Sequence, residues 1–395
     1  MNKKLKVLYI QQGNVDKSNM KYYDVLAKNK KLDVNVIVPK FVPKKEGGVS
    51  YWRVFTGRYE KRYPDQTFSP DYNIILLKMR LAGKSAHSYK GLFKTLSKLN
   101  PDVVQIYDVP WGAVVTQVIL WKKLFKKKTK IVLYDFENID DPHKEEFLYS
   151  LFYYKLLQKF NIKNLDGLLA GTKEVENILR KKSFKKPAYV MGNGIDETVF
   201  KKKDVSKLRK ELGLENSFVI GFSGQFIEQK GILTLIDAAS LIKDKNIKLL
   251  LIGFGIFTPK IKEYLKKKGL QDKALVVDKK LGPLVADYIN CMDVMVIPSE
   301  TTKYWKEQFG RVNAETMLCE VPAIGSSSGS IPEVLGEAGL IFKEKNPEDL
   351  KEKIVKLMND KELRKKMVKK GKEIALKYYT FDKRAEQTYD FYLRL

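Results

Sequence analysis

The stretch that decides the fold is Glu307–Glu333, which reads EQFGRVNAETMLCEVPAIGSSSGSIPE. Glu307 and Glu315 stand eight positions apart, with Phe309-Gly310 between them. A helix-compatible apolar pattern follows, then a short strand-like run, and then a Gly/Ser loop that opens another helix. Glycine lets the backbone approach a ligand closely, and a helix start presents N–H groups and a positive dipole end. This arrangement favours a bound anion such as a phosphate.

The spacing of the two glutamates adds a second indication. A continuous helix would separate their carboxylates by roughly 12 Å, which suits two hydroxyl-bearing groups on either side of a diphosphate. An ordinary helix start with an acidic first turn is the purely structural alternative.

Further blocks of sequence surround this stretch. They are KLKVLYIQQGN, VMGNGIDETVF, GFSGQFIEQKGILTLIDAA, LLLIGFG, DVMVIPSE and IPEVLGEAGLIF. Together with the E-x(7)-E spacing, they resemble the retaining glycosyltransferases of the GT-B fold, family 4. The resemblance is dense over Ala188–Phe342 and loose over residues 11–130. It implies an α/β protein with two doubly wound Rossmann-like domains that face each other across a cleft.

The alternation of apolar and helical segments agrees with that fold class. A chain of 395 residues predicts two domains, and strands that alternate with helices predict parallel βαβ units. We expect an N-terminal acceptor-binding domain over residues 1–190, completed by a C-terminal helix at 380–395. A nucleotide-sugar-binding domain would occupy residues 191–379. Residues 40–80 look like an insertion outside the core scaffold.

Composition narrows the functional classes. The net charge of +27 predicts an attraction to polyanions, although lysines on solvated faces explain it equally well. Nucleic acid is not expected, since no nucleic-acid-binding motif is present.

In the segment WKKLFKKKTK, Trp121, Leu124 and Phe125 share one helix side among lysines, which suits an anionic membrane surface. An ordinary helix C-terminus is the alternative. Two isolated cysteines and a basic, short first strand favour a cytoplasmic protein, with a peripheral place at the inner face of the membrane left open.

Lys230 lies six residues after Gly224 at a strand-to-helix junction, where its charge would meet a phosphate. The resembled family usually carries Arg where this chain has Gln225, so Arg311 is a candidate substitute. The resemblance implies that Glu307 binds donor-sugar hydroxyls and Glu315 the ribose hydroxyls. The complete predicted donor-binding set is Gly13, Gly224, Gln225, Lys230, Phe309, Gly310, Arg311, Val312 and Glu315.

Histidine is scarce, with only His87 and His143 in the chain, which argues against a Ser-His-Asp device. Members of the resembled family often carry a His after the strand that corresponds to Ile131–Tyr134. Here Glu137 and Asn138 occupy that position. We therefore expect them to act beside Glu307 and Lys230 in catalysis, unless the acidic cluster only caps a helix near Pro142.

The resemblance implies a metal-independent, cofactor-free retaining transferase. It would move a hexose from a nucleotide-diphosphate sugar to a glycan or lipid-linked acceptor in surface polysaccharide synthesis. The alternative is a non-catalytic sugar-nucleotide-binding relative or partner subunit, suggested by Gln225 and the missing His.

Overall fold

The computed structural model describes residues 4–11, 17–40, 42–43, 59–60, 72–80, 87–140, 148–244 and 246–395. The chain forms two compact units. The N-terminal unit runs to Gly192 and includes Arg384–Leu395, and the C-terminal unit contains Asn193–Lys383.

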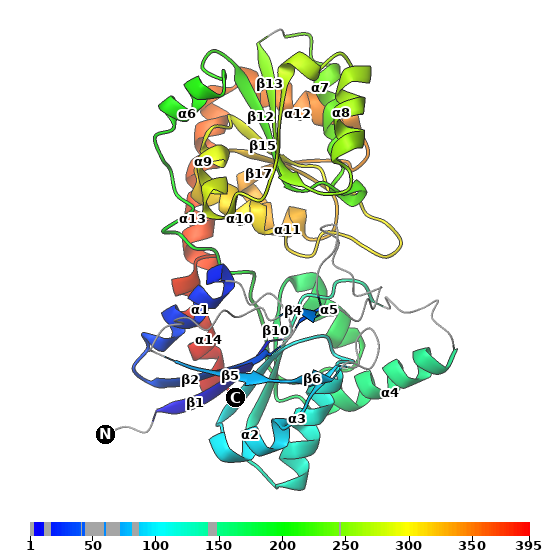
Figure 1. Ribbon diagram of the computed structural model, residues 1–395, viewed down its shortest axis with the longest axis vertical. Helices are drawn as coiled ribbons and strands as arrows, with labels where there is room; N and C mark the ends of the chain where they lie inside the picture. The colour runs from blue at the N-terminus through cyan, green and yellow to red at the C-terminus, as the bar shows by residue number, and fades with distance from the viewer. Residues whose placement is uncertain are drawn as a thin grey trace. The chain divides into compact units, whose positions relative to one another are not determined.

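The N-terminal unit is built on a seven-stranded sheet in the order β11-β10-β9-β8-β1-β2-β5, with all neighbouring strands parallel (Figure 1). Its strands are β1 (Leu5–Ile10), β2 (Leu32–Pro39), β5 (Asn73–Leu77), β8 (Val103–Tyr107), β9 (Lys130–Asp135), β10 (Gly167–Ala170) and β11 (Ala188–Val190). Two short antiparallel pairs accompany it: β3 (Val42–Pro43) with β4 (Tyr59–Glu60), and β6 (Met79–Arg80) with β7 (Ser88–Tyr89).

Helices cover both faces of this sheet. One face packs against α2 (Leu92–Leu99), α3 (Ala113–Leu124), α4 (Leu148–Asn164) and α5 (Lys173–Lys181), whose apolar side chains meet those of β8, β9 and β10. On the other face, α1 (Lys17–Ala27) and α14 (Phe381–Leu393) are joined by a 2.8 Å hydrogen bond between Tyr22 and Thr388. Tyr392 of α14 bonds to Tyr9 of β1 at 3.0 Å, so the C-terminal helix is part of this unit's core.

Two sequence expectations were wrong here. Residues 73–77 form β5, an edge strand of the main sheet, so the region 40–80 contributes to the core scaffold. Trp121 is fully buried, and its Nε1 donates to Ser97 Oγ at 2.9 Å, so it cannot enter a membrane. The helix directs this indole toward the sheet, because burying a large ring in the apolar cluster there is more favourable than leaving it in water.

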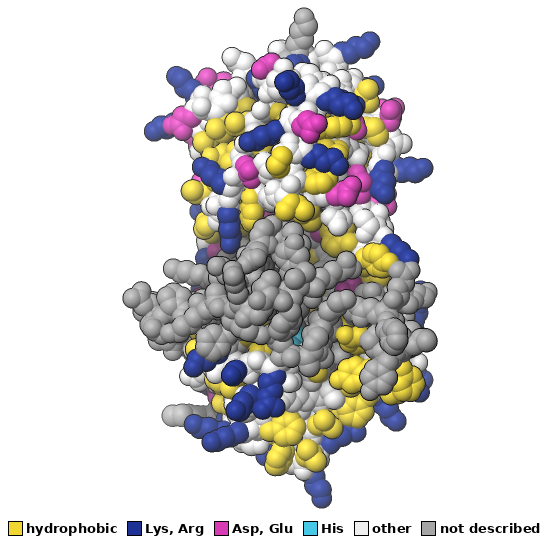
Figure 2. Space-filling view, turned by 45° about the vertical axis from the view of Figure 1, so that its right-hand side comes forward, with side chains coloured by type: hydrophobic (Ala, Val, Ile, Leu, Met, Phe, Trp, Pro, Cys, Tyr) yellow, Lys and Arg dark blue, Asp and Glu magenta, His cyan; other side chains and the backbone are white. Residues whose placement is uncertain are grey.

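Charge is spread widely over the molecule. Lys and Arg side chains are scattered across the face of both units that Figure 2 shows. Among the described residues, no helix is both long enough and apolar enough to cross a bilayer.

The C-terminal unit contains a six-stranded parallel sheet in the order β14-β13-β12-β15-β16-β17. Its strands are β12 (Phe218–Gln225), β13 (Ile247–Phe254), β14 (Ala274–Asp278), β15 (Val294–Ile297), β16 (Ala323–Ser326) and β17 (Gly339–Phe342). The α-helices are α6 (Ser206–Glu211), α7 (Ile232–Ser240), α8 (Thr258–Lys267), α9 (Val285–Asn290), α10 (Arg311–Leu318), α11 (Ile331–Leu335), α12 (Pro347–Asn359) and α13 (Lys361–Tyr378). Short 3-10 turns are η1 (Glu228–Lys230), η2 (Gln271–Lys273), η3 (Gly282–Leu284) and η4 (Gly336–Ala338).

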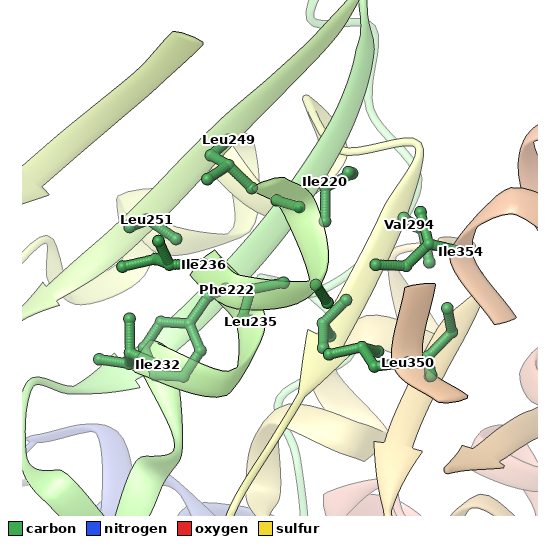
Figure 3. Packing of buried hydrophobic residues seen from close by; sticks show 14 of the residues in the cluster. Ile220, Phe222, Ile232, Leu235, Ile236, Leu249, Leu251, Val294, Leu350 and Ile354 are labelled. Atoms are coloured by element: carbon green, nitrogen blue, oxygen red, sulfur yellow. The ribbon is translucent and has the colours of Figure 1, made fainter. Parts of the chain in front are cut away.

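The core of this unit lies between the sheet and helices α7 and α12. Figure 3 shows Leu251 of β13 beside Ile236 of α7, with Ile220 and Phe222 of β12 and Leu350 of α12 in the same cluster. Strands buried in this way read as continuous apolar runs, which is why the sequence predicted them. The predicted fold class, α/β with two parallel sheets each covered by helices, is confirmed.

Candidate functional site

The strand order of the C-terminal unit places a switch point between β12 and β15. From β12 the chain proceeds outward through β13 and β14, and from β15 it proceeds the opposite way through β16 and β17. Ligands of open α/β sheets bind beyond the carboxyl ends of the strands at such a point. Lys230 follows β12 and Glu307 follows β15, so both belong to this edge.

Lys230 and Glu307 form an ion pair there. The Nζ of Lys230 lies 2.6 Å from Oε2 of Glu307, and the Oγ of Ser299 donates to the same oxygen at 2.7 Å. The ammonium also lies 5.0 Å from the ring centroid of Trp305, within range of a cation–π attraction. The Glu307 side chain is only 9% exposed, so its charge is held by these two donors in a poorly solvated place.

A glycine makes this contact possible. Gly231 has φ +64°, and a Cβ at this position would stand 1.9 Å from the carbonyl oxygen of Pro298. Only glycine combines that left-handed conformation with such a close approach. The sequence Lys230-Gly231 therefore brings the end of β12 directly against the end of β15.

The Gly/Ser loop after β16 completes the same edge. Ser330 N donates to the carbonyl oxygen of Glu307 at 3.0 Å, and a Cβ on Gly329 would lie 2.1 Å from that oxygen. Ser326 Oγ donates to the Ser299 carbonyl at 2.5 Å. Hydrogen bonds thus connect the ends of the three strands β12, β15 and β16. The side chain of Ser330, the residue before α11, makes no capping hydrogen bond to this helix.

Helix α10 begins directly beyond Glu307. Gly310, at φ +64°, precedes it, and the side-chain Nδ2 of Asn313 donates to the carbonyls of Phe309 (3.2 Å) and Gly310 (2.9 Å). Phe309 is buried, with its ring 5.3 Å from that of Tyr379. Val312 lies half-buried in the first turn. The N–H groups of a first helical turn point back past the helix start, where they can donate to an anion, and binding of a phosphate here stays a prediction.

Glu315 has its own cation. The Nε of Arg311 lies 3.6 Å from Oε1 of Glu315, one helical turn away. Burial raises the pKa of the Glu315 carboxyl, and the charge of Arg311 opposes that rise. Glu307 precedes α10, so the separation calculated for a continuous helix does not apply to the two glutamates. In this structure Lys230 contacts Glu307 and Arg311 contacts Glu315, and a shared diphosphate stays a prediction.

Gly224 and Gln225 are the last two residues of β12. Gln225 is exposed and stands opposite Phe254 of β13. The close backbone approach in this region belongs to Gly253, because a Cβ there would lie 1.9 Å from the Gly224 carbonyl oxygen. The role of Gly224 as the point of approach therefore stays a prediction.

The remaining predicted residues belong to the N-terminal unit. Glu137 follows β9, and its Oε1 accepts from Ile139 N at 3.2 Å, while Asn138 is buried. Glu137 N donates to Oδ1 of Asp135, and burial raises the pKa of that aspartate well above its usual range. Gly13 and His143 lie outside the described residues.

Sequence reasoning missed several polar residues at the two sheet edges. Ser299 and Trp305 flank the Lys230–Glu307 pair, and Asp108, the first acidic residue after β8, lies 3.8 Å from His87. Both members of that second pair are buried, and burial lowers the pKa of His87 to about 4. Ser299 and Asp108 directly follow apolar strand segments, and this position in the sequence could have identified them as candidate site residues.

Part of this chain is similar in sequence to known glycosyltransferases. Residues 204–374 match the family described as Glycosyl transferases group 1. An uncharacterized glycosyltransferase of Methanocaldococcus jannaschii is 34% identical over 56% of this chain and 57% of its own length. The capsular polysaccharide biosynthesis glycosyltransferase CapM of Staphylococcus aureus is 34% identical over 46% of this chain and 47% of its own. The matched stretch thus spans about half the length of these curated relatives.

Solved structures extend the likeness to the whole chain. HepE of Anabaena in complex with UDP has a TM-score of 0.73 at 16% identity, covering 99% of this chain and 100% of that one. At this level of identity the similarity concerns the fold. Residues 204–374 therefore match the family described as Glycosyl transferases group 1, within a chain that has the GT-B fold.

Proposed function

We propose that this protein is a retaining glycosyltransferase of family 4. It transfers a hexose from a nucleotide-diphosphate sugar to a glycan or lipid-linked acceptor in surface polysaccharide or glycoconjugate synthesis. The observation that carries this proposal is the Lys230–Glu307 pair at the switch point, next to the start of α10. The capsular polysaccharide role in the name of CapM supports the class of product.

The basic and acidic residues of this corner bind different parts of the donor. Lys230, Arg311 and the first turn of α10 stabilise the diphosphate as negative charge grows on it, an electrostatic role. Glu307 orients the sugar through its hydroxyl groups, and Glu315 holds the ribose. Gly224, Gln225 and Gly13 line the approach to the phosphates.

The transfer step needs no covalent enzyme intermediate. The bond between the anomeric carbon and the β-phosphate oxygen breaks while the acceptor oxygen bonds to that carbon from the same face. The acceptor proton passes to the departing phosphate oxygen. Glu137 or Asn138 supports the positive charge at the anomeric carbon, and no metal or cofactor takes part. The protein works in the cytoplasm.

A second candidate is a non-catalytic sugar-nucleotide-binding relative or partner subunit. It is favoured by the neutral side chain of Gln225 at a position where the resembled family carries Arg, since Gln brings no charge to a diphosphate. Such a protein would bind the donor without consuming it.

One experiment separates the two. The full chain is mixed with a panel of nucleotide sugars, and ligands that raise its thermal midpoint are selected. Each selected sugar is then followed for release of the nucleoside diphosphate, with and without a chelator. UDP-glucose is the first sugar to test, because UDP occupies the structurally similar HepE.

The Lys230→Ala variant is compared with Lys203→Ala, which removes an ion pair of equal length, 2.6 Å to Asp287. An enzyme releases diphosphate, loses this activity in Lys230→Ala and keeps it in Lys203→Ala. Binding without release, for every sugar and with glycan and lipid-linked acceptors added, supports the non-catalytic alternative. A chelator that abolishes release contradicts metal independence.

A further inference from the structure

The outer side of helices α3 and α4 exposes large apolar side chains. Leu124 is 68% exposed and Phe125 51%, and on α4 Phe152 is 64% and Leu156 52% exposed. Leu120 and Tyr153 are also exposed and extend the two groups. These six residues are called the α3–α4 surface. Leu120 and Leu124 of α3 are four residues apart, as are Phe152 and Leu156 of α4, so each pair lies on one side of its helix.

The two helices are neighbours. Thr116 Oγ1 of α3 donates to Oδ1 of Asn161 of α4 at 2.9 Å, and the ammonium of Lys123 lies 5.4 Å from the Phe160 ring. Both pack inward on the same face of the sheet through residues such as Val118 and Ile162. Their exposed apolar groups therefore lie on the outside of one helical layer. Figure 2 shows hydrophobic side chains gathered on the N-terminal unit with Lys and Arg side chains around them.

The charged side chains within helices α2, α3 and α4 all have one sign. Helices α2, α3 and α4 contain no Asp or Glu. Lysines that are exposed on or directly after α3 and α4 are Lys123, Lys126, Lys128, Lys155, Lys159 and Lys163. Lysines of an ordinary solvated surface alternate with acids, so this layer differs from the rest of the chain.

We propose that the α3–α4 surface docks on an anionic phospholipid bilayer. Leucine and phenylalanine side chains enter the boundary between headgroups and acyl chains, while the lysines contact lipid phosphates. Phosphates of nucleic acid would satisfy the lysines equally well but leave the apolar side chains in water. The combination of exposed apolar groups and acid-free basic surroundings is what selects a lipid surface. Trp121, which the sequence suggested as an anchor, instead fastens α3 to the protein interior.

The inference is tested without any sugar substrate, so its outcome is independent of the proposed function. The full chain is sedimented with vesicles of phosphatidylcholine alone or mixed with phosphatidylglycerol. The double variant Leu124→Ser/Leu156→Ser removes apolar contacts, and Lys126→Gln/Lys155→Gln removes charge. Matched controls in the C-terminal unit are Ile256→Ser/Leu284→Ser, whose side chains are 64% and 58% exposed, and Lys262→Gln/Lys266→Gln.

We expect binding to anionic vesicles only, weakened by added salt because exposed charges are screened. The apolar double variant lowers the partition coefficient by roughly tenfold or more, since burying such side chains is worth at least that factor. Each lost lysine lowers it about fivefold. The controls bind as the unmodified chain does, and circular dichroism confirms that all variants fold.

Three results overturn the proposal. The first is equal or absent binding to the two kinds of vesicle. The second is a sign of diffuse attraction by net charge. Either unchanged binding of Leu124→Ser/Leu156→Ser or equal competition by duplex DNA would be such a sign. The third is a dimer in solution that this variant converts to a monomer, which would assign the surface to a second copy of the chain.

Discussion

Lys230 Nζ and Glu307 Oε2 lie 2.6 Å apart although 77 residues separate them in the sequence. The pair joins the ends of β12 and β15 at the switch point of the C-terminal sheet. The two side chains differ in solvent exposure, since that of the glutamate is 9% exposed and that of the lysine 21%. Removing the lysine therefore leaves a poorly solvated carboxylate that loses its cation and still accepts a hydrogen bond from Ser299.

The first prediction concerns stability. Lys230→Ala should lower the free energy of unfolding by roughly 1–3 kcal/mol, because a buried charge loses its partner. Lys203→Ala, which breaks the more exposed pair with Asp287, should cost about 0–1 kcal/mol. Urea unfolding measures both. The double variant Lys230→Ala/Glu307→Ala should cost less than the sum of its parts, and strict additivity would contradict a direct interaction.

The second prediction separates the two glutamates. Glu315→Ala should weaken binding of the nucleoside diphosphate by roughly tenfold or more, since a charged acceptor for the ribose is lost. Glu307→Ala should mainly lower kcat. Calorimetric titration and initial rates measure the two effects. Glu176→Ala is the control, because Glu176 pairs with Arg180 one turn away at similar exposure. Unchanged affinity in Glu315→Ala would refute its assignment to the ribose.

The third prediction concerns Arg311. Arg311→Ala should reduce affinity for a nucleoside diphosphate by about tenfold while leaving affinity for the bare nucleoside nearly unchanged, because a charge-assisted contact is lost. The same comparison for Lys230→Ala should show the same preference. If Arg311→Ala keeps the full preference for the diphosphate, the arginine serves only Glu315.

The fourth prediction concerns pH. Burial lowers the pKa of His87 to about 4 in the folded chain. In the unfolded chain the imidazole takes up its proton at about pH 6.5, so between these two values only the unfolded chain is protonated at this residue. Stability from the neutral imidazole is present above about pH 6.5 and is lost as pH falls from about 6.5 to 4, by roughly 3 kcal/mol.

The measurement is the difference in unfolding free energy between the unmodified chain and His87→Gln across this window. A difference is needed because Asp135, whose pKa is raised by burial, changes stability in the opposite direction. Asp108, 3.8 Å from the imidazole, is the charged group that faces it. Parallel pH profiles for the two proteins would show that His87 is not the titrating group.

The fifth prediction concerns the loop after β9. Glu137→Gln should lower kcat by about tenfold to a hundredfold with donor affinity unchanged, because a carboxylate near the anomeric carbon acts electrostatically. Asn138→Ala tests the neutral alternative, and its thermal midpoint is checked because Asn138 is buried. Normal turnover in both variants would assign the loop a purely structural role, consistent with the bond from Ile139 N to Glu137.

The sequence alone was enough for the features that depend on local pattern. The buried central strands, such as Val294–Ile297, are continuous apolar runs whose period and flanking turns are visible in the chain. The helix-compatible pattern that forms α10 was visible in the same way, whereas the start of this helix at Arg311, after Gly310, was not predicted.

The tertiary structure decided what depends on partners distant in the chain. The edge strand Asn73–Leu77 has no clear period of its own and is specified by pairing with β2. Whether Trp121 faces lipid or the protein interior depends on the cluster formed by the sheet and α2. The pairing of Lys230 with Glu307 likewise requires the parallel register of β12 with β15, which no local pattern contains. Local propensities act over a few residues, whereas these contacts arise only when the packed sheet brings separate strand ends together.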